Sequence, residues 1–121
     1  MNTNSKQDER MASMRFASVY PLYLAKVEKK GRTKEELDQV IEWLTGFGPG
    51  LLKKMLESNV NFQAFFQQAK LNPNAVHITG LICGYRVEDI QNPLTQKIRF
   101  LDKLVDELAK GKAMNKILRS S

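Results

Sequence analysis

The sequence has very few of the residues that build disulfides and metal sites. Among its 121 residues there is one cysteine, Cys83, and one histidine, His77. A single cysteine excludes an internal disulfide and agrees with a reducing compartment. Two such residues are also too few for a structural zinc site, which takes four ligands. We therefore expect no metal and no cofactor, and we interpret Cys83 as an unreactive small apolar residue.

Long apolar runs and known catalytic motifs are absent as well. No apolar run approaches the roughly 20 residues that cross a membrane. The first residues, MNTNSKQDERMASM, are polar where a secretory signal needs an apolar core. We expect a cytoplasmic protein without a membrane partner. Neither a Ser-His-Asp order nor a glycine-rich phosphate or dinucleotide motif occurs, so the sequence assigns no catalytic residue.

The composition is that of an ordinary folded domain. Hydrophobic residues make up 42% of the chain and charged residues 26%, and this length suits one domain with a buried core. Residues 1–14 show no periodicity, which predicts a flexible N-terminal tail. Residues 15–119 are then expected to form a single helical domain.

Local signals for helices recur along this domain. Thr33 and Glu36 have the spacing of a capping box at a helix start. Gly46 can end that helix, and Asn61 and Asn92 can cap two later ones. Apolar residues follow each start at helical spacing, and no segment shows the alternation of a strand. The sequence predicts an all-α, compact bundle of about six helices.

Residues 74–90 predict a central buried helix. On a helical wheel their apolar residues gather on two opposite sides, which is typical of a helix packed between others. Gly80 and Gly84 lie four residues apart, where the loss of side chains allows another backbone to come close. Gly80, Cys83, Gly84 and Val87 would share this face. They would contact either other helices of the same chain or a second copy in a homodimer.

The sequence LTGFGPGLLKKML, residues 44–56, resembles the helix-hairpin-helix motif of non-specific DNA-binding proteins. In that motif the backbone N–H groups of the turn bind a phosphate. Gly46 and Gly48 match the turn, and Lys53 and Lys54 could support the contact. Leu52 departs from the motif, which has a small residue at this place. A glycine-rich connection is also an ordinary turn between helices, so both interpretations stay open.

The charge distribution permits weak nucleic-acid binding without requiring it. The net charge is +6, and bases are concentrated in residues 26–34 and 110–119. Lys29, Lys30 and Arg32 of the first segment could add phosphate contacts to those of the turn. A basic balance also serves solubility alone.

Four blocks of the sequence carry a family resemblance. They are FASVYPLYLAKVEKKGRTKEELDQVIEWLTGF, LNPN, ITGLICGYRVEDI and NPLTQKIRFLDKLVDELAKGKAMNKIL. These blocks resemble a bacterial family of unknown function, the domain-of-unknown-function family 2200, from about Met14 to Leu118. The resemblance implies a small bacterial protein that forms the complete family domain by itself. It implies no activity, cofactor or catalytic residue.

Three classes of function remain open. The sequence favours a non-catalytic binding or regulatory module whose partner is unknown. The second class is a nucleic-acid binder that uses residues 46–54 and the basic segments. The third is a small enzyme that uses carboxylates such as Glu88 and Asp89, or Arg86 and Tyr85, in a cleft.

Overall fold

A computed structural model describes residues 5–119, which contain seven α-helices and one short hairpin. The helices are α1 (Ser5–Ser13), α2 (Phe16–Lys29), α3 (Lys34–Thr45), α4 (Pro49–Glu57), α5 (Phe62–Gln68), α6 (Pro93–Ala109) and α7 (Met114–Ile117). Between α5 and α6 lie the 3₁₀ helix η1 (Pro73–His77), the strands β1 (Leu81–Ile82) and β2 (Tyr85–Arg86), and the 3₁₀ helix η2 (Val87–Asp89).

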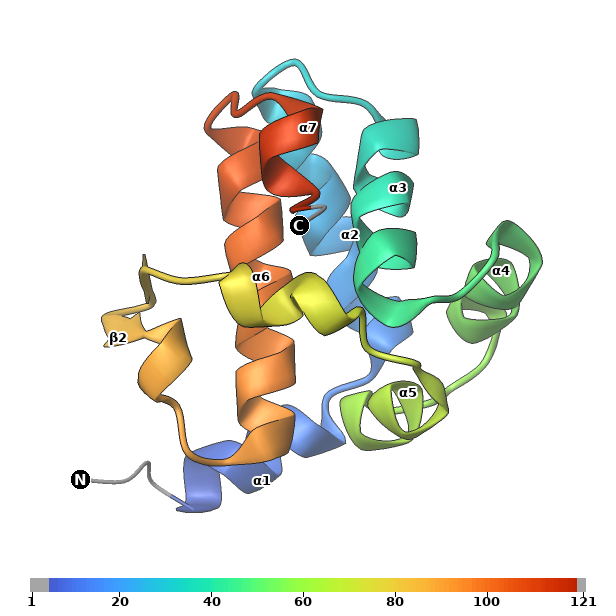
Figure 1. The fold of residues 1–121 in the computed structure, drawn as a ribbon. Helices are drawn as coiled ribbons and strands as arrows, with labels where there is room; N and C mark the ends of the chain where they lie inside the picture. The colour runs from blue at the N-terminus through green and yellow to red at the C-terminus, as the bar shows by residue number, and fades with distance from the viewer. Residues whose placement is uncertain (1–4, 120–121) are drawn as a thin grey trace.

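Helix α6 is the central element of the fold. It has 17 residues, a length of about 25 Å, and α1, α2, α3, α5 and α7 all contact it. Figure 1 shows α2 and α3 on one side of α6 and the hairpin on the other, with α1 across one end. The all-α class and the compact bundle are confirmed. None of the helices within residues 5–119 is long and apolar enough to cross a membrane.

The helix starts follow from the local sequence signals. The Thr33 hydroxyl accepts from the Glu36 N–H at 3.1 Å, and the Glu36 carboxylate accepts from the Thr33 N–H at 2.9 Å, which confirms the capping box. The Asn61 and Asn92 side chains cap α5 and α6. Gly46 ends α3 in the left-handed conformation at φ +74°, where a Cβ would cost energy. These signals succeed because each depends only on neighbouring residues.

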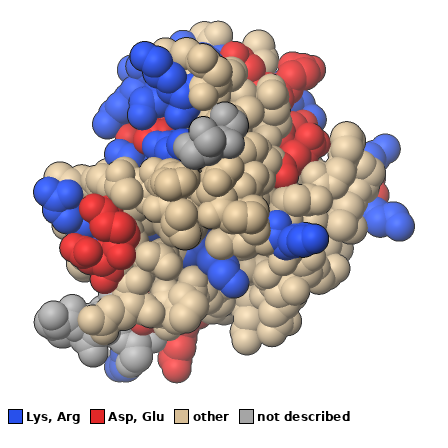
Figure 2. Space-filling view, in the orientation of Figure 1, with Lys and Arg blue, Asp and Glu red and all other residues tan. Residues whose placement is uncertain are grey.

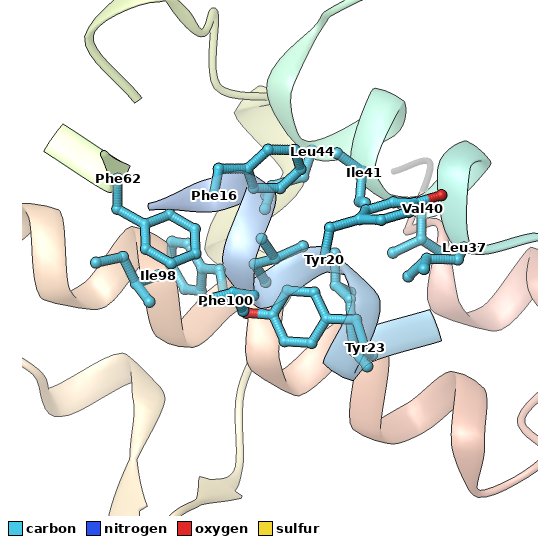
Figure 3. Close-up of a cluster of buried hydrophobic side chains, with 14 of the residues drawn as sticks. Phe16, Tyr20, Tyr23, Leu37, Val40, Ile41, Leu44, Phe62, Ile98 and Phe100 are labelled. Atoms are coloured by element: carbon cyan, nitrogen blue, oxygen red, sulfur yellow. The ribbon is translucent and has the colours of Figure 1, made fainter. Parts of the chain in front are cut away.

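Aromatic side chains fill the centre of the core. Phe16 of α2 stacks on Phe65 of α5 with ring centroids 4.2 Å apart, and Phe16 also meets Phe62 edge to face. Figure 3 shows the labelled side chains of α2, α3, α5 and α6 converging on this cluster. Two tyrosines of α2 enter the same core and end on carboxylates: Tyr23 donates to Asp102 of α6 at 2.6 Å, and Tyr20 donates to Asp38 of α3.

The prediction of a flexible tail over residues 1–14 is wrong for residues 5–13, which form α1. Met11 is buried in the core, and the Thr95 hydroxyl of α6 donates to Asp8 at 2.7 Å. One buried apolar residue in a polar helix leaves no periodicity to detect, which explains the error. Residues 1–4 lie outside the described residues.

The prediction of a central buried helix near 74–90 is also wrong. This segment contains η1, an antiparallel hairpin in which Leu81 pairs with Arg86, and η2. Cys83 and Gly84 form the turn with φ of +51° and +85°, and Gly80 has φ +108°. Two successive residues with positive φ are typical of a tight hairpin turn. The glycines therefore allow the positive φ angles of this segment. They do not mark a close approach of two helices.

Candidate functional site

The hairpin docks on α6 through three polar side chains. Gln96 donates to the carbonyl of Val87 at 3.0 Å, Arg99 to the sulfur of Cys83 at 3.2 Å, and Lys103 to the carbonyl of Leu81 at 3.1 Å. Positions 96, 99 and 103 share one face of a helix. This face of α6 thus holds β1, the turn and the start of η2.

A carboxylate closes the base of the hairpin. The Glu88 Oε1 atom accepts from the backbone N–H of Gly80 at 2.9 Å, and the Val87 N–H donates to the Gly80 carbonyl at 2.9 Å. The hydrogen bond from Gly80 lowers the pKa of Glu88 below its ordinary value. Glu88 is therefore ionised at neutral pH and held at a fixed place.

A surface pocket of about 370 Å³ lies between η1, η2 and α6. It is lined by Leu71, Asn72, Pro73, Ala75, Val76, Ile78, Glu88, Gln96 and Phe100. Ala75, Ile78 and Phe100 are buried and form an apolar floor. At the rim, Val76 leaves 71% of its surface exposed. Val76 and the buried residues beside it thus form an apolar hollow that is open to solvent.

The described lining of the pocket contains few side chains that could act as an acid, a base or a nucleophile. Glu88 is the one ionisable residue among the described residues that line it. The Asn72 side chain accepts from the Asn74 N–H and donates to the carbonyl of Trp43, so it holds η1 against α3. Within residues 5–119, no three His, Cys, Asp or Glu side chains are placed to hold a metal ion.

The residues of the enzyme hypothesis do not meet in this pocket. Tyr85 lines a cavity of only about 10 Å³ between the hairpin and α1. The side chain of Arg86 is 62% exposed and reaches Glu88 at 3.5 Å. Glu88 and Asp89 are neighbours in η2, but Asp89 does not line the pocket.

A second hollow of about 360 Å³ lies between α1, α5 and the start of α6. Its lining residues are Asp8, Glu9, Ala12, Gln63, Asn92 and Leu94. None of them is buried, so this hollow has no floor comparable to that under Val76. The pocket beside the hairpin is the better candidate site.

The four residues assigned to a packing or dimer face are close together but do not form one face. Val87 is fully buried in the core. A Cβ on Gly80 would lie 3.3 Å from the Lys103 amine, whereas Cys83 and Gly84 are exposed at the turn. A homodimer through this segment stays a prediction, and its contact would lie on the turn and outer strand face.

In the turn between α3 and α4, the Gly46 N–H donates to the Glu42 carbonyl at 2.9 Å and the Phe47 N–H to the Thr45 hydroxyl at 3.2 Å. Gly46 is left-handed, Gly48 caps α4, and Pro49 is its first residue. Lys53 and Lys54 are exposed on α4. The first N–H groups of a helix have no carbonyl partner one turn earlier in the helix, and they form the positive end of the helix dipole.

The basic segments lie at the other end of α3. This helix has 12 residues, which separates its ends by about 18 Å. Lys29 and Lys30 are exposed at the end of α2. Arg32 is held by two 3.1 Å bonds to Glu36 and one of 3.0 Å to the carbonyl of Lys112. Figure 2 shows bases gathered near the ends of α6 and α7, and others apart from them on α4. The residues predicted to contact nucleic acid do not form one continuous surface.

Sequence reasoning missed the pocket because its walls are far apart in the chain. No local signal brings Val76 of η1 to Phe100 and Gln96 of α6. The hairpin has a weak local signal, since Gly84 follows Cys83 between Ile82 and Tyr85, two residues that favour strands. That signal would have placed Glu88 after a turn and outside a helix.

Comparisons with known proteins show relatives over almost the whole chain. The family described as "Uncharacterized protein conserved in bacteria (DUF2200)" matches residues 10–119. The crystal structure of uncharacterized protein SP1917 is similar, with 46% identity, a TM-score of 0.85 and 91% of each chain covered. No curated protein matches this chain.

Proposed function

Because its match spans residues 10–119, the chain belongs to the uncharacterised bacterial family DUF2200, and we propose that it is a non-catalytic module that binds a segment of another protein. The segment lies in the pocket between η1, η2 and α6. One observation carries the proposal: a buried apolar floor at Ile78 and Phe100 adjoins an exposed apolar rim at Val76. Covering this rim would remove apolar surface from water, at about 25 cal/mol per Å².

The shape of the pocket favours part of a macromolecule over a small ligand. Sites for small molecules enclose most of their ligand's surface. Here Pro73 and Val76 at the rim are exposed, so a ligand resting on Phe100 keeps its outer side in water. A protein segment covers that side with the rest of its own chain.

Selection from a peptide library tests the proposal. Random heptapeptides on phage are selected on the wild-type protein and on Val76→Ser. We expect peptides with micromolar affinity for the wild type that bind Val76→Ser several times more weakly. Leu22 is 67% exposed on α2 and lines none of the described pockets, so Leu22→Ser is the matched control. Equal binding to all three proteins, or no selected peptide, contradicts the proposal.

The turn between α3 and α4 supports a second candidate, non-specific nucleic-acid binding. The observation in its favour is the combination of left-handed Gly46, Pro49 at the start of α4, and the exposed amines of Lys53 and Lys54. A phosphate at this turn would lie at the positive end of α4, next to the N–H groups of its first turn.

A labelled DNA duplex at 50 and 200 mM salt tests this candidate. Phosphate contacts release counterions, so affinity should fall steeply with salt. Lys53→Ala/Lys54→Ala should then weaken binding more than Lys29→Ala/Lys30→Ala, which removes the same charge at the other end of α3. Equal effects of the two pairs would indicate attraction to net charge and would reject a site at the turn.

A further inference from the structure

Resting on the proposed protein-binding function, we propose that the pocket selects a segment in which an apolar side chain is followed or preceded by a lysine or arginine. The apolar side chain rests on Ile78 and Phe100. The cation meets the Glu88 carboxylate, which is the one charged group in the described lining of the pocket.

The position of Glu88 is set before any partner arrives. Its Oε1 atom is held by the Gly80 N–H at 2.9 Å, and η2 is held to α6 by the bond from Gln96 to the Val87 carbonyl. A carboxylate that is already oriented loses little freedom when it binds a cation. The second oxygen, Oε2, lies 3.5 Å from the Arg86 guanidinium.

Arg86 acts as an internal substitute for the cation of the partner. Its Nη1 atom lies 3.5 Å from Glu88 Oε2, and its side chain is 62% exposed. The ion pairs of Arg119 with Glu107 and of Arg99 with Asp102 are shorter, at 2.7 and 3.0 Å. An exposed pair with such a long contact contributes little stability. A cation of the partner can therefore displace Arg86.

The local charge opposes the charge of the whole molecule. The net charge is +6, yet Figure 2 shows a compact acidic group over the hairpin, with basic side chains beside it. At physiological salt, charges are screened beyond about 8 Å. The nearby Lys103 amine donates to the Leu81 carbonyl, so a cation in contact with Glu88 responds to this carboxylate more than to the lysines elsewhere on the surface.

Two restricted heptapeptide libraries separate this inference from the function on which it rests. One library omits Lys and Arg, and the other omits Asp and Glu; both retain all apolar residues. We expect the second library to supply the stronger binders to the full-length protein, with a base next to an apolar residue. Equal binders from both libraries would overturn the charge preference while keeping the proposed function. Binders from neither would overturn both.

Three variants then test the assigned contact on the strongest selected peptide. Glu88→Gln keeps an oxygen for the Gly80 N–H and removes the charge, so affinity should fall about threefold to fivefold. Arg86→Gln removes the internal competitor, an exposed ion pair of small energy, and should raise affinity by about twofold. Asp89→Asn removes a neighbouring charge that does not line the pocket, and it should change affinity least. Equal losses in Glu88→Gln and Asp89→Asn, or a loss in Arg86→Gln, would overturn the assignment. Amide NMR spectra confirm that each variant is folded.

Discussion

Cys83 occupies a backbone position that is unfavourable for its side chain. Its φ of +51° is left-handed, and Gly84 follows at +85°. A left-handed residue with a Cβ costs roughly 1–2 kcal/mol, and asparagine tolerates this conformation best among residues other than glycine. The chain thus has a cysteine where tight hairpin turns usually have Asn.

Replacing Cys83 by Asn should raise the free energy of unfolding by about 1 kcal/mol. Gly84→Ala should lower it by a similar amount or more, because alanine gains the same strain. Urea unfolding measures both. Cys83→Ser is the control: it removes the sulfur contact of Arg99 but keeps an unfavourable left-handed residue. A gain in Cys83→Ser equal to that in Cys83→Asn would show that the thiol, and not the backbone, is the cause.

At the scale of elements, the success of the sequence analysis depends on how local each signal is. The capping box at Thr33 and the caps at Asn61 and Asn92 concern one helical turn, and they were predicted correctly. The error over residues 74–90 has a physical reason. Apolar residues on two sides fit a buried helix, but they also fit short strands and turns that are covered by α6. The pocket could not be predicted at all, because Val76 and Phe100 line one pocket only after folding.

Helix α7 is only four residues long, and an ion pair of Arg119 holds the segment that follows it against α6. Arg119 donates to both oxygens of Glu107 at 2.8 and 2.7 Å, and it also reaches the carbonyl of His77. The Glu107 side chain is 7% exposed. Without Arg119, the buried Glu107 carboxylate keeps the longer contact with the Lys112 amine at 3.4 Å. That contact compensates the buried charge poorly, so losing Arg119 costs more than the pair itself contributes.

Arg119→Met should therefore lower the free energy of unfolding by about 3 kcal/mol. The double variant Glu107→Gln/Arg119→Met should recover part of this loss, since no buried charge remains. Urea unfolding of the wild type, Glu107→Gln, Arg119→Met and the double variant completes the cycle. Lys112→Met is the matched control, because that side chain is 40% exposed at 3.4 Å from Glu107. Its loss should stay below about 1 kcal/mol. A double variant no more stable than Arg119→Met would argue against the buried charge as the cause.

At the scale of the whole molecule, two tyrosines of α2 connect three helices. Tyr20 donates to Asp38 of α3, and Tyr23 donates to Asp102 of α6. Burial, and then the neighbouring carboxylate, raise the pKa of both hydroxyls above the ordinary value of 10.0. Both tyrosines therefore stay protonated in the fold at a pH where the unfolded chain ionises them.

The two tyrosines make the free energy of unfolding depend on pH above 10. Below pH 10 both states carry the protons, and the full stability is present. Above pH 10 the unfolded state releases protons that the native state keeps, so the free energy of unfolding falls as pH rises. The slope is about 1.4 kcal/mol per pH unit for each tyrosine. Urea unfolding between pH 8 and 11 should show this decline.

The variant Tyr20→Phe/Tyr23→Phe separates this effect from the titration of lysines. It should be less stable than the wild type at pH 8, because two hydrogen bonds to carboxylates are lost. Above pH 10 its stability should decline less steeply, since it lacks the two buried hydroxyls but retains every lysine. Tyr85→Phe, at an exposed tyrosine of the hairpin, should keep the wild-type slope. If the free energy of unfolding of the double variant declines as steeply as that of the wild type, the alkaline loss arises from the lysines. The tyrosine–carboxylate bonds would then join the three helices without making their packing sensitive to pH.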